Sequence, residues 1–401
     1  MSARPWLTFV GLGEDGVRGL PKASLDALAA AEVIAGAPRH LALVPEFAAE
    51  RLVWPVPFVD GIPALLRLRG RQVAMLVSGD PFWHGAGTVL SRHLALGEWH
   101  ALPAPSTFSL AAAALGWAVE TTLCLGLHAA PFARLRPSLA PGVRALVLVR
   151  DGEAVGKLAE WLTVEGFGST QMHVLEALGG PRQRQRQRLA VADALDFTDI
   201  AHPVAVGLEV AGEGATVPLV SGRPDTLFAH DGQLTKRPVR ALTLSALAPR
   251  PFERLWDIGA GAGSIAIEWL LAHASTEADA IEANPTRAAR LQANAQRLGA
   301  DRLHLVQARA PEGLDALARP DAVFIGGGLS ETLLTRLWAL LPAGCRIVAN
   351  AVTLEAEALL AQWHQSEGGN LLRIELAEAQ PLGSRRGWQA RYPVVQWSVT
   401  R

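Results

Sequence analysis

A glycine-rich segment, Asp257-Ile-Gly-Ala-Gly-Ala-Gly263, is the feature that most restricts how this chain of 401 residues can fold. It follows a predicted strand at 255–258 and precedes a predicted helix that begins at Ser264. Glycines at this place allow a tight turn and let another molecule approach the backbone closely. A strand, a glycine loop and a helix in this order predict an α/β domain.

The rest of the C-terminal half repeats this pattern. Short β-type runs alternate with helical stretches, and two later β-type runs would close the sheet, which predicts a doubly wound, Rossmann-like fold. The expected strands are 255–258, 278–281, 303–306, 322–325, 346–349, 371–376 and 394–399.

The glycine loop indicates which ligand it binds. Glu282 ends the next predicted strand, 19 residues after Gly263, where an acid that binds ribose hydroxyls is expected. Asp257 opens the loop, and an acid there suits the cationic end of S-adenosylmethionine (SAM) and would repel the pyrophosphate of NAD. The residues therefore favour SAM, with NAD and a merely structural glycine turn as the alternatives.

Several segments around this loop share their residues with one enzyme family. With the glycine loop, the segments 232–240, 281–285, 310–312, 321–328 and 349–355 resemble the decarboxylating precorrin methyltransferases of cobalamin biosynthesis, over about residues 230–390. The resemblance implies a class I methyltransferase fold. Asn350, in the last segment, has a second interpretation as an N-cap of the next helix. The implied SAM site, with Asp257 added from its chemistry, is Thr235, Asp257, Gly259, Ala260, Gly261, Ala262, Gly263, Glu282 and Ala310.

The N-terminal half is a second α/β region with different motifs. Its clearest predicted strands are 6–10, 73–77, 145–149 and 203–208, with helices at 22–31 and 110–115. The loop 10–16, taken alone, is a strand-ending turn. Together with Ser78-Gly-Asp-Pro81 and the segment 103–110 it resembles the tetrapyrrole methylases, the class III SAM enzymes, over about residues 1–210.

This second resemblance implies an α/β fold of two subdomains with SAM in the cleft between them. Asp15 stands where the family usually has a third glycine, which leaves the contact made by that loop open. His128 matches a family Leu-His segment, with a core histidine as the alternative. By motif, Gly79, Asp80, Pro81, Ser106 and Thr107 would border the SAM site, and Gly11 and Gly13 would border the substrate.

Composition separates the two halves. Glycine and proline punctuate 213–234, so we expect a tetrapyrrole methylase domain at 1–212, a linker at 213–234 and a class I methyltransferase domain at 235–401. Within the first domain, 180–188 is rich in arginine and glutamine. We expect a solvated turn and helix start there, or alternatively a contact with a carboxylate-rich ligand.

Two unlike SAM domains imply two methylations of one substrate. The resemblance implies precorrin-6B, a tetrapyrrole with many carboxylates, converted to precorrin-8 and carbon dioxide. It assigns C-15 methylation and decarboxylation of the ring-C acetate to the C-terminal domain, and C-5 methylation to the N-terminal domain. No catalytic residue emerges from the sequence. We expect Lys236, Arg385 and Arg386 to bind substrate carboxylates.

Composition also restricts partners and location. The net charge of −1 gives no basic field for nucleic acid, so a nucleic-acid methyltransferase fused to an unrelated α/β domain is only the second interpretation. A non-catalytic SAM-binding regulator is a third. Two distant cysteines predict neither disulfide nor metal site, and no signal peptide or membrane span is expected, which favours the cytoplasm. Both families commonly self-associate, so we expect a homo-oligomer.

Overall fold

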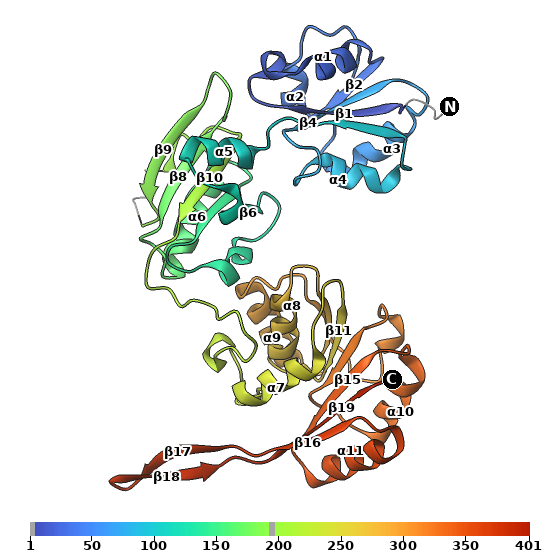
Figure 1. Cartoon of the computed structure of the whole chain (residues 1–401), viewed down its shortest axis with the longest axis vertical. Coiled ribbons are helices and arrows are strands. Elements are labelled where there is room, and N and C mark those ends of the chain that lie inside the picture. The colour runs from blue at the N-terminus through green and yellow to red at the C-terminus, as the bar shows by residue number, and fades with distance from the viewer. Residues whose placement is uncertain (1–4, 192–196) are drawn as a thin grey trace. The chain divides into compact units, whose positions relative to one another are not determined.

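The structure is a computed structural model that describes residues 5–191 and 197–401 (Figure 1). The chain divides into two compact units. Residues up to 130 and from 139 to 215 form the first unit, and residues 131–138 and 216–401 form the second. Each unit is described by itself.

The first unit starts with a parallel α/β subdomain. Strands β1 and β4 are buried along almost their whole length, as strands covered by helices on both faces require. The strands are β1 (Leu7–Leu12), β2 (Val33–Gly36), β3 (Glu50–Val53), β4 (Val73–Ser78) and β5 (Trp99–Leu102), in the order β3-β2-β4-β1-β5. The helices are α1 (Lys22–Ala29), α2 (Pro38–Ala42), α3 (Ile62–Leu66) and α4 (Ala86–Leu90).

A second subdomain completes this unit, so the expected two-subdomain α/β fold is confirmed. Its sheet has the order β6-β7-β10-β8-β9 and is antiparallel except between β6 and β7. Its elements are α5 (Thr107–Leu115), β6 (Leu123–Gly126), β7 (Arg144–Leu148), α6 (Gly152–Val164), β8 (Gln171–Glu176), β9 (Arg184–Leu189) and β10 (Val204–Glu209).

The segment rich in arginine and glutamine is a strand, so the helix start expected at 180–188 is wrong. Alternate residues of β9 are exposed, and the Arg/Gln alternation has the period of two that strands require. Arg184 and Arg186 lie on the same face and contact the buried Glu176 of β8, with N–O distances of 2.7 and 3.0 Å. The arginines therefore neutralise a buried carboxylate of the protein itself.

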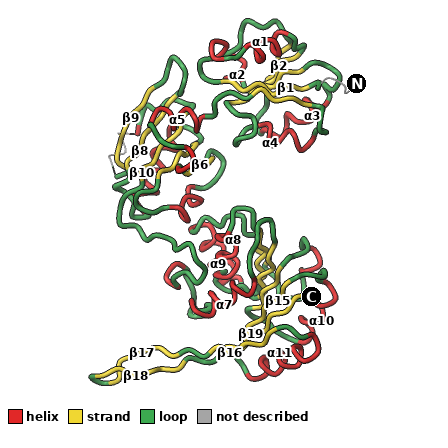
Figure 2. The backbone as a smooth tube through the Cα atoms, in the orientation of Figure 1, coloured by secondary structure: helices red, strands yellow, loops and turns green. Residues whose placement is uncertain are grey.

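The second unit is a doubly wound sheet, as the sequence predicts (Figure 2). Its strand order is β13-β12-β11-β14-β15-β19-β16, parallel from β13 to β15 and antiparallel at β19 and β16. The strands are β11 (Arg254–Ile258), β12 (Glu277–Ile281), β13 (His304–Val306), β14 (Ala322–Ile325), β15 (Arg346–Ala351), β16 (Asn370–Ile374) and β19 (Val394–Thr400). The helices are α7 (Arg237–Leu247), α8 (Ser264–Ala272), α9 (Pro285–Arg297), α10 (Glu331–Leu340) and α11 (Leu354–Glu367).

Side chains of β11 alternate between the two cores of this unit. Leu255 packs among residues of α7, α8 and α9 on one face, whereas Trp256 packs among residues of α10 and α11 on the other. The same alternation along the other strands fixes the sheet between two helical layers. It leaves the carboxyl ends of the parallel strands, and the loops that follow them, free to form a site.

Part of the segment expected to be a linker belongs to the C-terminal fold. Val217, Leu227 and Phe228 are buried in the same core as α8 and α9. Compact packing of the second unit therefore starts at residue 216, ahead of the expected domain start at 235.

A two-stranded hairpin extends from the second unit and was not expected from the sequence. It consists of β17 (Ala377–Leu382) and β18 (Arg385–Ala390), between β16 and β19, and projects beyond the sheet (Figure 1). Leu382 and Trp388 are 71% and 79% exposed on it. A two-stranded hairpin by itself is only marginally stable in water. Large apolar side chains that are exposed on such a hairpin suggest a surface that contacts another molecule.

Candidate active sites

A cavity of about 1050 Å³ opens at the carboxyl ends of β11, β12, β14 and β15. This is the edge where doubly wound sheets bind ligands. Of the residues that the sequence places in the SAM site, all but Asp257 and Gly263 line the cavity: Thr235, Gly259, Ala260, Gly261, Ala262, Glu282 and Ala310.

The glycine loop needs glycine for its backbone conformation. Gly259, Gly261 and Gly263 have φ values of +69°, +58° and +78°. A Cβ atom on Gly259 would lie 2.7 Å from the Cα atom of Gly327, so no side chain fits there. A Cβ on Gly261 would meet no described atom within 4 Å and would take up space at the cavity wall. The loop thus presents bare backbone to a ligand, as a SAM site requires.

Glu282 lines the same cavity beside the glycine loop. Its carboxylate accepts hydrogen bonds from the backbone N–H groups of Gly261 and Asn284, both at 2.8 Å. A carboxylate has about four acceptor sites, so both oxygens keep lone pairs for hydroxyl groups. The acceptor oxygens of Glu282 and the bare backbone of the glycine loop therefore fit SAM.

Asp257 lies behind the loop rather than in the cavity wall. It is 1% exposed, and one of its oxygens accepts a hydrogen bond of 3.0 Å from the N–H of Ala266 in the first turn of α8. Burial raises the pKa of this carboxyl to about 7, against the Ala266 hydrogen bond that lowers it, and the charge of Glu282 raises it further. Asp257 thus holds the start of α8 from behind the cavity wall.

A buried ion cluster, which the sequence analysis missed, holds the loop that carries Thr235. Arg240 is fully buried, contacts Glu268 with an Nε–Oε1 distance of 2.6 Å and donates to the backbone oxygen of Thr235. Arg223 lies 3.5 Å from the same carboxylate. The available signal was Glu268 itself, a lone acid within an apolar helix, because a buried charge requires a partner.

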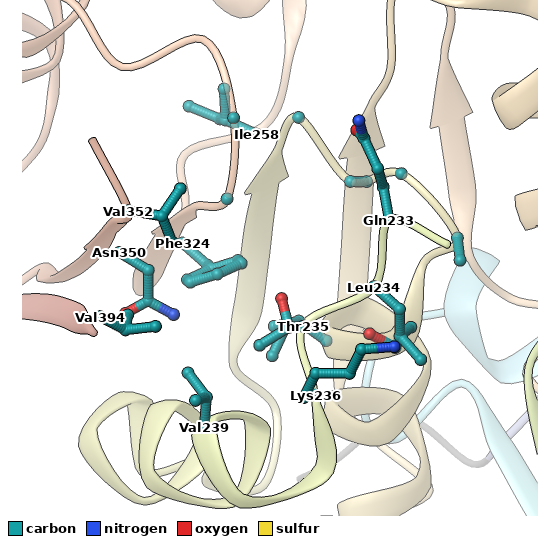
Figure 3. A pocket seen from close by; sticks show the side chains of 18 of the residues that line it. Gln233, Leu234, Thr235, Lys236, Val239, Ile258, Phe324, Asn350, Val352 and Val394 are labelled. Carbon is teal, nitrogen blue, oxygen red and sulfur yellow. The ribbon is translucent and has the colours of Figure 1, made fainter. Parts of the chain in front are cut away.

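Only some of the cations expected to bind substrate lie at the cavity. Lys236 lines the cavity, beside Thr235 (Figure 3). Arg385 and Arg386 lie on β18 and do not line it, so the expected contact there is not supported by their position. Arg391 lines the cavity and forms an ion pair of 2.7 Å with Glu378.

Asn350 also faces this cavity, opposite Thr235 (Figure 3). The interpretation as a helix cap is wrong, because the side chain of Thr353 caps α11 by accepting from the N–H of Ala356.

The N-terminal unit contains a smaller pocket of about 250 Å³. Asp80, Ser106 and Thr107 line it, and Leu148 of the second subdomain contributes to its wall. Gly79 and Pro81 do not line it. Gly79 has a φ of +54°, and a Cβ there would lie 2.9 Å from the Pro105 oxygen, so it allows two loops to pack together.

Neither Gly11 nor Gly13 of the first glycine loop lines this pocket. A Cβ on Gly11 would lie 2.1 Å from the Gly79 oxygen and 2.4 Å from the Ala104 nitrogen. The ends of β1, β4 and β5 therefore meet at Gly11. Gly13 and Gly19 both lie next to the Asp15 carboxylate, so a side chain at either glycine would meet it. His128 is exposed, so the core-histidine interpretation is wrong.

His40, which the sequence analysis did not single out, lines the same pocket. Its Nε2 atom is 2.9 Å from the Ser78 hydroxyl and 2.8 Å from the Arg39 guanidinium, which also pairs with Glu14. Burial, and then the charge of Arg39, lower the pKa of His40 to about 4. The imidazole is therefore neutral at physiological pH.

Comparisons with known proteins match both units of the chain. The family model described as Tetrapyrrole (Corrin/Porphyrin) Methylases matches residues 6–192, and the one described as Precorrin methyltransferase domain matches residues 226–401. A Sinorhizobium protein named precorrin-6Y C(5,15)-methyltransferase [decarboxylating] is 46% identical over 402 residues, which cover 99% of this chain and 97% of the relative.

Two shorter relatives are also similar to this chain. A cobalt-precorrin-6B C(15)-methyltransferase (decarboxylating) of Salmonella typhimurium is 32% identical and covers 42% of this chain and 91% of its own. The crystal structure of the C-terminal domain of precorrin-6Y C5,15-methyltransferase from Rhodobacter capsulatus is 54% identical, with a TM-score of 0.45, and covers 46% of this chain and 100% of that chain.

The fold and the two matched families define a two-domain methyltransferase, an enzyme class that takes its methyl group from SAM. The full-length match makes the assignment more specific. The chain belongs to the family of decarboxylating precorrin-6Y C(5,15)-methyltransferases of cobalamin biosynthesis. Among the described residues, no helix has the length and apolar character needed to cross a membrane.

Proposed function

We propose that this enzyme methylates precorrin-6B, also called precorrin-6Y, at C-5 and C-15 and removes the ring-C acetate carboxyl as carbon dioxide, which gives precorrin-8. The observation that carries the proposal is the presence of two unlike sites in one chain, matched along its whole length by a relative whose name contains both methylations and the decarboxylation. Each site would take one SAM.

The two reactions would be divided between the domains. We assign C-15 methylation and decarboxylation to residues 235–401, and C-5 methylation to residues 1–212. The Salmonella relative, whose name contains only the C-15 step and the decarboxylation, covers 42% of this chain, close to the size of one domain. The SAM residues would be those of the two site predictions, with Asp257, Gly263, Gly79 and Pro81 acting by shaping the loops.

Alignment is the main task of the C-terminal site. SAM supplies a methyl group already activated by its sulfonium, and the electron-rich meso carbon of the substrate is the nucleophile. The glycine loop and Glu282 would fix one reactant, and the apolar wall formed by Phe324, Val352 and Val394 would hold the other and exclude water. Correct orientation alone is worth about 7–11 kcal/mol of the barrier.

Carboxylates of the substrate need cations where they enter the cavity. Lys236, which lines the cavity beside Thr235, is our first candidate, and Arg309 is a second cation in the same lining. Arg391 also lines it, but its charge is shared with Glu378. The proposed chemistry requires no metal ion.

We also propose that the enzyme works in the cytoplasm as a homo-oligomer and acts on a small molecule rather than on nucleic acid. The exposed Trp388 and Leu382 of the hairpin support self-association, because contact with a second copy of the chain would bury these apolar side chains. The net charge of −1 does not favour nucleic acid.

The function is tested by incubating the protein with SAM and precorrin-6B and measuring the mass of the product. The gain of two methyl groups with the loss of one carbon dioxide is expected. An unchanged tetrapyrrole, with methyl transfer to labelled RNA or DNA, would support the nucleic-acid alternative; SAM binding without transfer would indicate a regulator.

A further inference from the structure

The two halves of the C-terminal cavity differ in what lines them. One part of the lining follows β11, β12 and β13, which are neighbours at one end of the strand order; it contains the glycine loop, Glu282 and Ala310. The other part, after β14, β15 and β16, combines apolar side chains such as Val352 and Val394 with the Glu378–Arg391 ion pair, and Asn350 brings an uncharged amide into it. If SAM occupies the first half, as the proposed function requires, the tetrapyrrole occupies the half that contains Asn350.

A network of buried side chains holds the Asn350 amide. Its Nδ2 donates to the Thr243 hydroxyl of α7 at 2.9 Å. Its Oδ1 accepts from Nε2 of Gln396 at 2.9 Å, and the same Nε2 donates to Thr243 at 3.0 Å. Asn350 and Gln396 are directly opposite each other on β15 and β19. Three elements of the fold therefore meet at this amide.

The hydrogen-bond directions in this network are fixed. The Thr243 hydroxyl donates its single hydrogen to the Val239 oxygen at 2.9 Å, so it accepts from both amides. Both –NH₂ groups must then face Thr243, which rules out the flipped orientation of either amide. Within the described residues, Asn350 keeps one N–H and one lone pair without a protein partner, and the residue faces the cavity (Figure 3).

Stability alone does not explain this arrangement. Thr243 is fully buried and Gln396 is 4% exposed, and well-packed apolar residues at such positions are often neutral or stabilising in comparison with a polar network. A locked amide with a spare N–H is instead what a site uses to orient a polar group of a ligand.

We propose that Asn350 is a substrate-binding residue whose spare N–H donates to a carboxylate oxygen of the tetrapyrrole, and that Thr243 and Gln396 are positioning residues that hold this N–H in place. The proposal rests on the proposed function. A hydrogen bond to a side-chain carboxylate fixes the rotation of the macrocycle in the cavity, and so decides which meso carbon meets the methyl group.

The test compares Asn350→Asp with the wild-type chain. The aspartate is isosteric, lacks the N–H and repels a carboxylate. We expect KM for precorrin-6B in the C-15 step to rise about 10- to 100-fold, as the loss of a hydrogen bond to a charged group predicts. Affinity for S-adenosylhomocysteine, measured calorimetrically, should stay within about twofold, because only the substrate half changes.

The positioning residues are tested by Thr243→Val and Thr243→Ser. Valine removes the acceptor that fixes both amides and should raise the same KM about tenfold, whereas serine keeps the hydroxyl and should restore it. Thr276→Val is the matched control, because Thr276 is an equally buried threonine whose hydroxyl bonds only to backbone oxygens and Arg302 in the same unit. It should lower the melting temperature without changing this KM.

Different results would reject the proposed function and the role of Asn350. If the wild-type chain does not convert precorrin-6B, the proposed function is rejected and this inference with it. If the wild type converts it and Asn350→Asp does so with an unchanged KM, only the inference is rejected. An equal rise in KM for Thr243→Val and Thr276→Val would also overturn it, since the effect would then follow stability.

Discussion

The two candidate sites form in different ways. In the C-terminal unit, one continuous loop with three glycines at positive φ borders a cavity of about 1050 Å³. In the N-terminal unit, the ends of three separate strands meet, with Gly11 and Gly79 packed against each other, beside a pocket of about 250 Å³. The first site depends on local backbone conformation, and the second on close packing between distant segments.

The largest expected effect comes from removing one glycine in each site. Gly259→Val and Gly79→Val both place a branched side chain at a positive φ and against neighbouring backbone. Each should lower the rate of the reaction at its own site at least about 100-fold, since a displacement of 1 Å at a site can have that effect. Product masses should show only C-5 chemistry for the first variant and only C-15 chemistry with decarboxylation for the second.

Melting curves and Gly344→Val provide the control. Gly344 also has a positive φ, +88°, but a Cβ there meets no described atom within 4 Å and it lines neither cavity. Both activities should survive in this variant. Loss of both activities in either site variant, with unchanged melting, would contradict the division between domains.

A smaller effect should come from Glu282→Gln. The amide keeps the shape but loses the charge that accepts hydrogen bonds from Gly261 and Asn284. KM for SAM in the C-15 step should rise roughly tenfold or more, and KM for SAM in the C-5 step should not change. Steady-state kinetics with product separation measures both. Equal increases would show that the sites are not independent.

The C-terminal unit carries the projecting hairpin of β17 and β18, whereas the described strands of the first unit all belong to its two five-stranded sheets. Trp388→Ser should weaken self-association about tenfold or more, as expected when a tryptophan anchor of an interface is removed. Light scattering over a concentration series measures this. Val164→Ser, at a 78% exposed position on α6, is the control and should leave the assembly unchanged. A monomeric wild-type protein would contradict the proposal.

The smallest effects concern pH, where the two sites should respond in opposite directions. The pKa of Asp257 is raised from 3.8 to about 7, so the native state binds more protons than the unfolded state in that window and its stability falls as pH rises. The pKa of His40 is lowered from 6.5 to about 4, so stability rises with pH in that window. The two slopes oppose each other between about pH 4 and 6.5.

Single variants should reveal each slope. In urea unfolding between pH 4.5 and 6.5, Asp257→Asn should make stability rise more steeply with pH than in the wild type, and His40→Gln should make it fall. Each difference is up to about 1.4 kcal/mol per pH unit. Parallel pH profiles for the wild type and both variants would contradict these shifts.

The same contrast explains what could be predicted from the sequence. The cofactor edge of the C-terminal unit was predictable, because strand, glycine loop and helix are contiguous from 255 onward and the acid at Glu282 follows at fixed spacing. Strand β9 was missed because all its side chains except Leu189 are polar, so it lacks the alternation of apolar and polar residues that marks a half-buried strand. Asp257 was placed in the cavity by charge, whereas burial and the Ala266 N–H hold it behind the loop.

Other features depend on three-dimensional contacts that no sequence pattern reveals. The ion pair of Arg240 with Glu268 and the network around Asn350 join elements far apart in the chain. The hairpin was not predicted because both faces of its strands are exposed and the only alternation, in β17, is of small alanines with polar residues, which is a weak strand signal.

The central claim is that one chain contains two independent SAM sites, and calorimetric titration with S-adenosylhomocysteine tests it most directly. The account predicts two equivalents bound per wild-type chain and one equivalent for either Gly259→Val or Gly79→Val. A single equivalent for the wild type, or the loss of all binding in either variant, would contradict it.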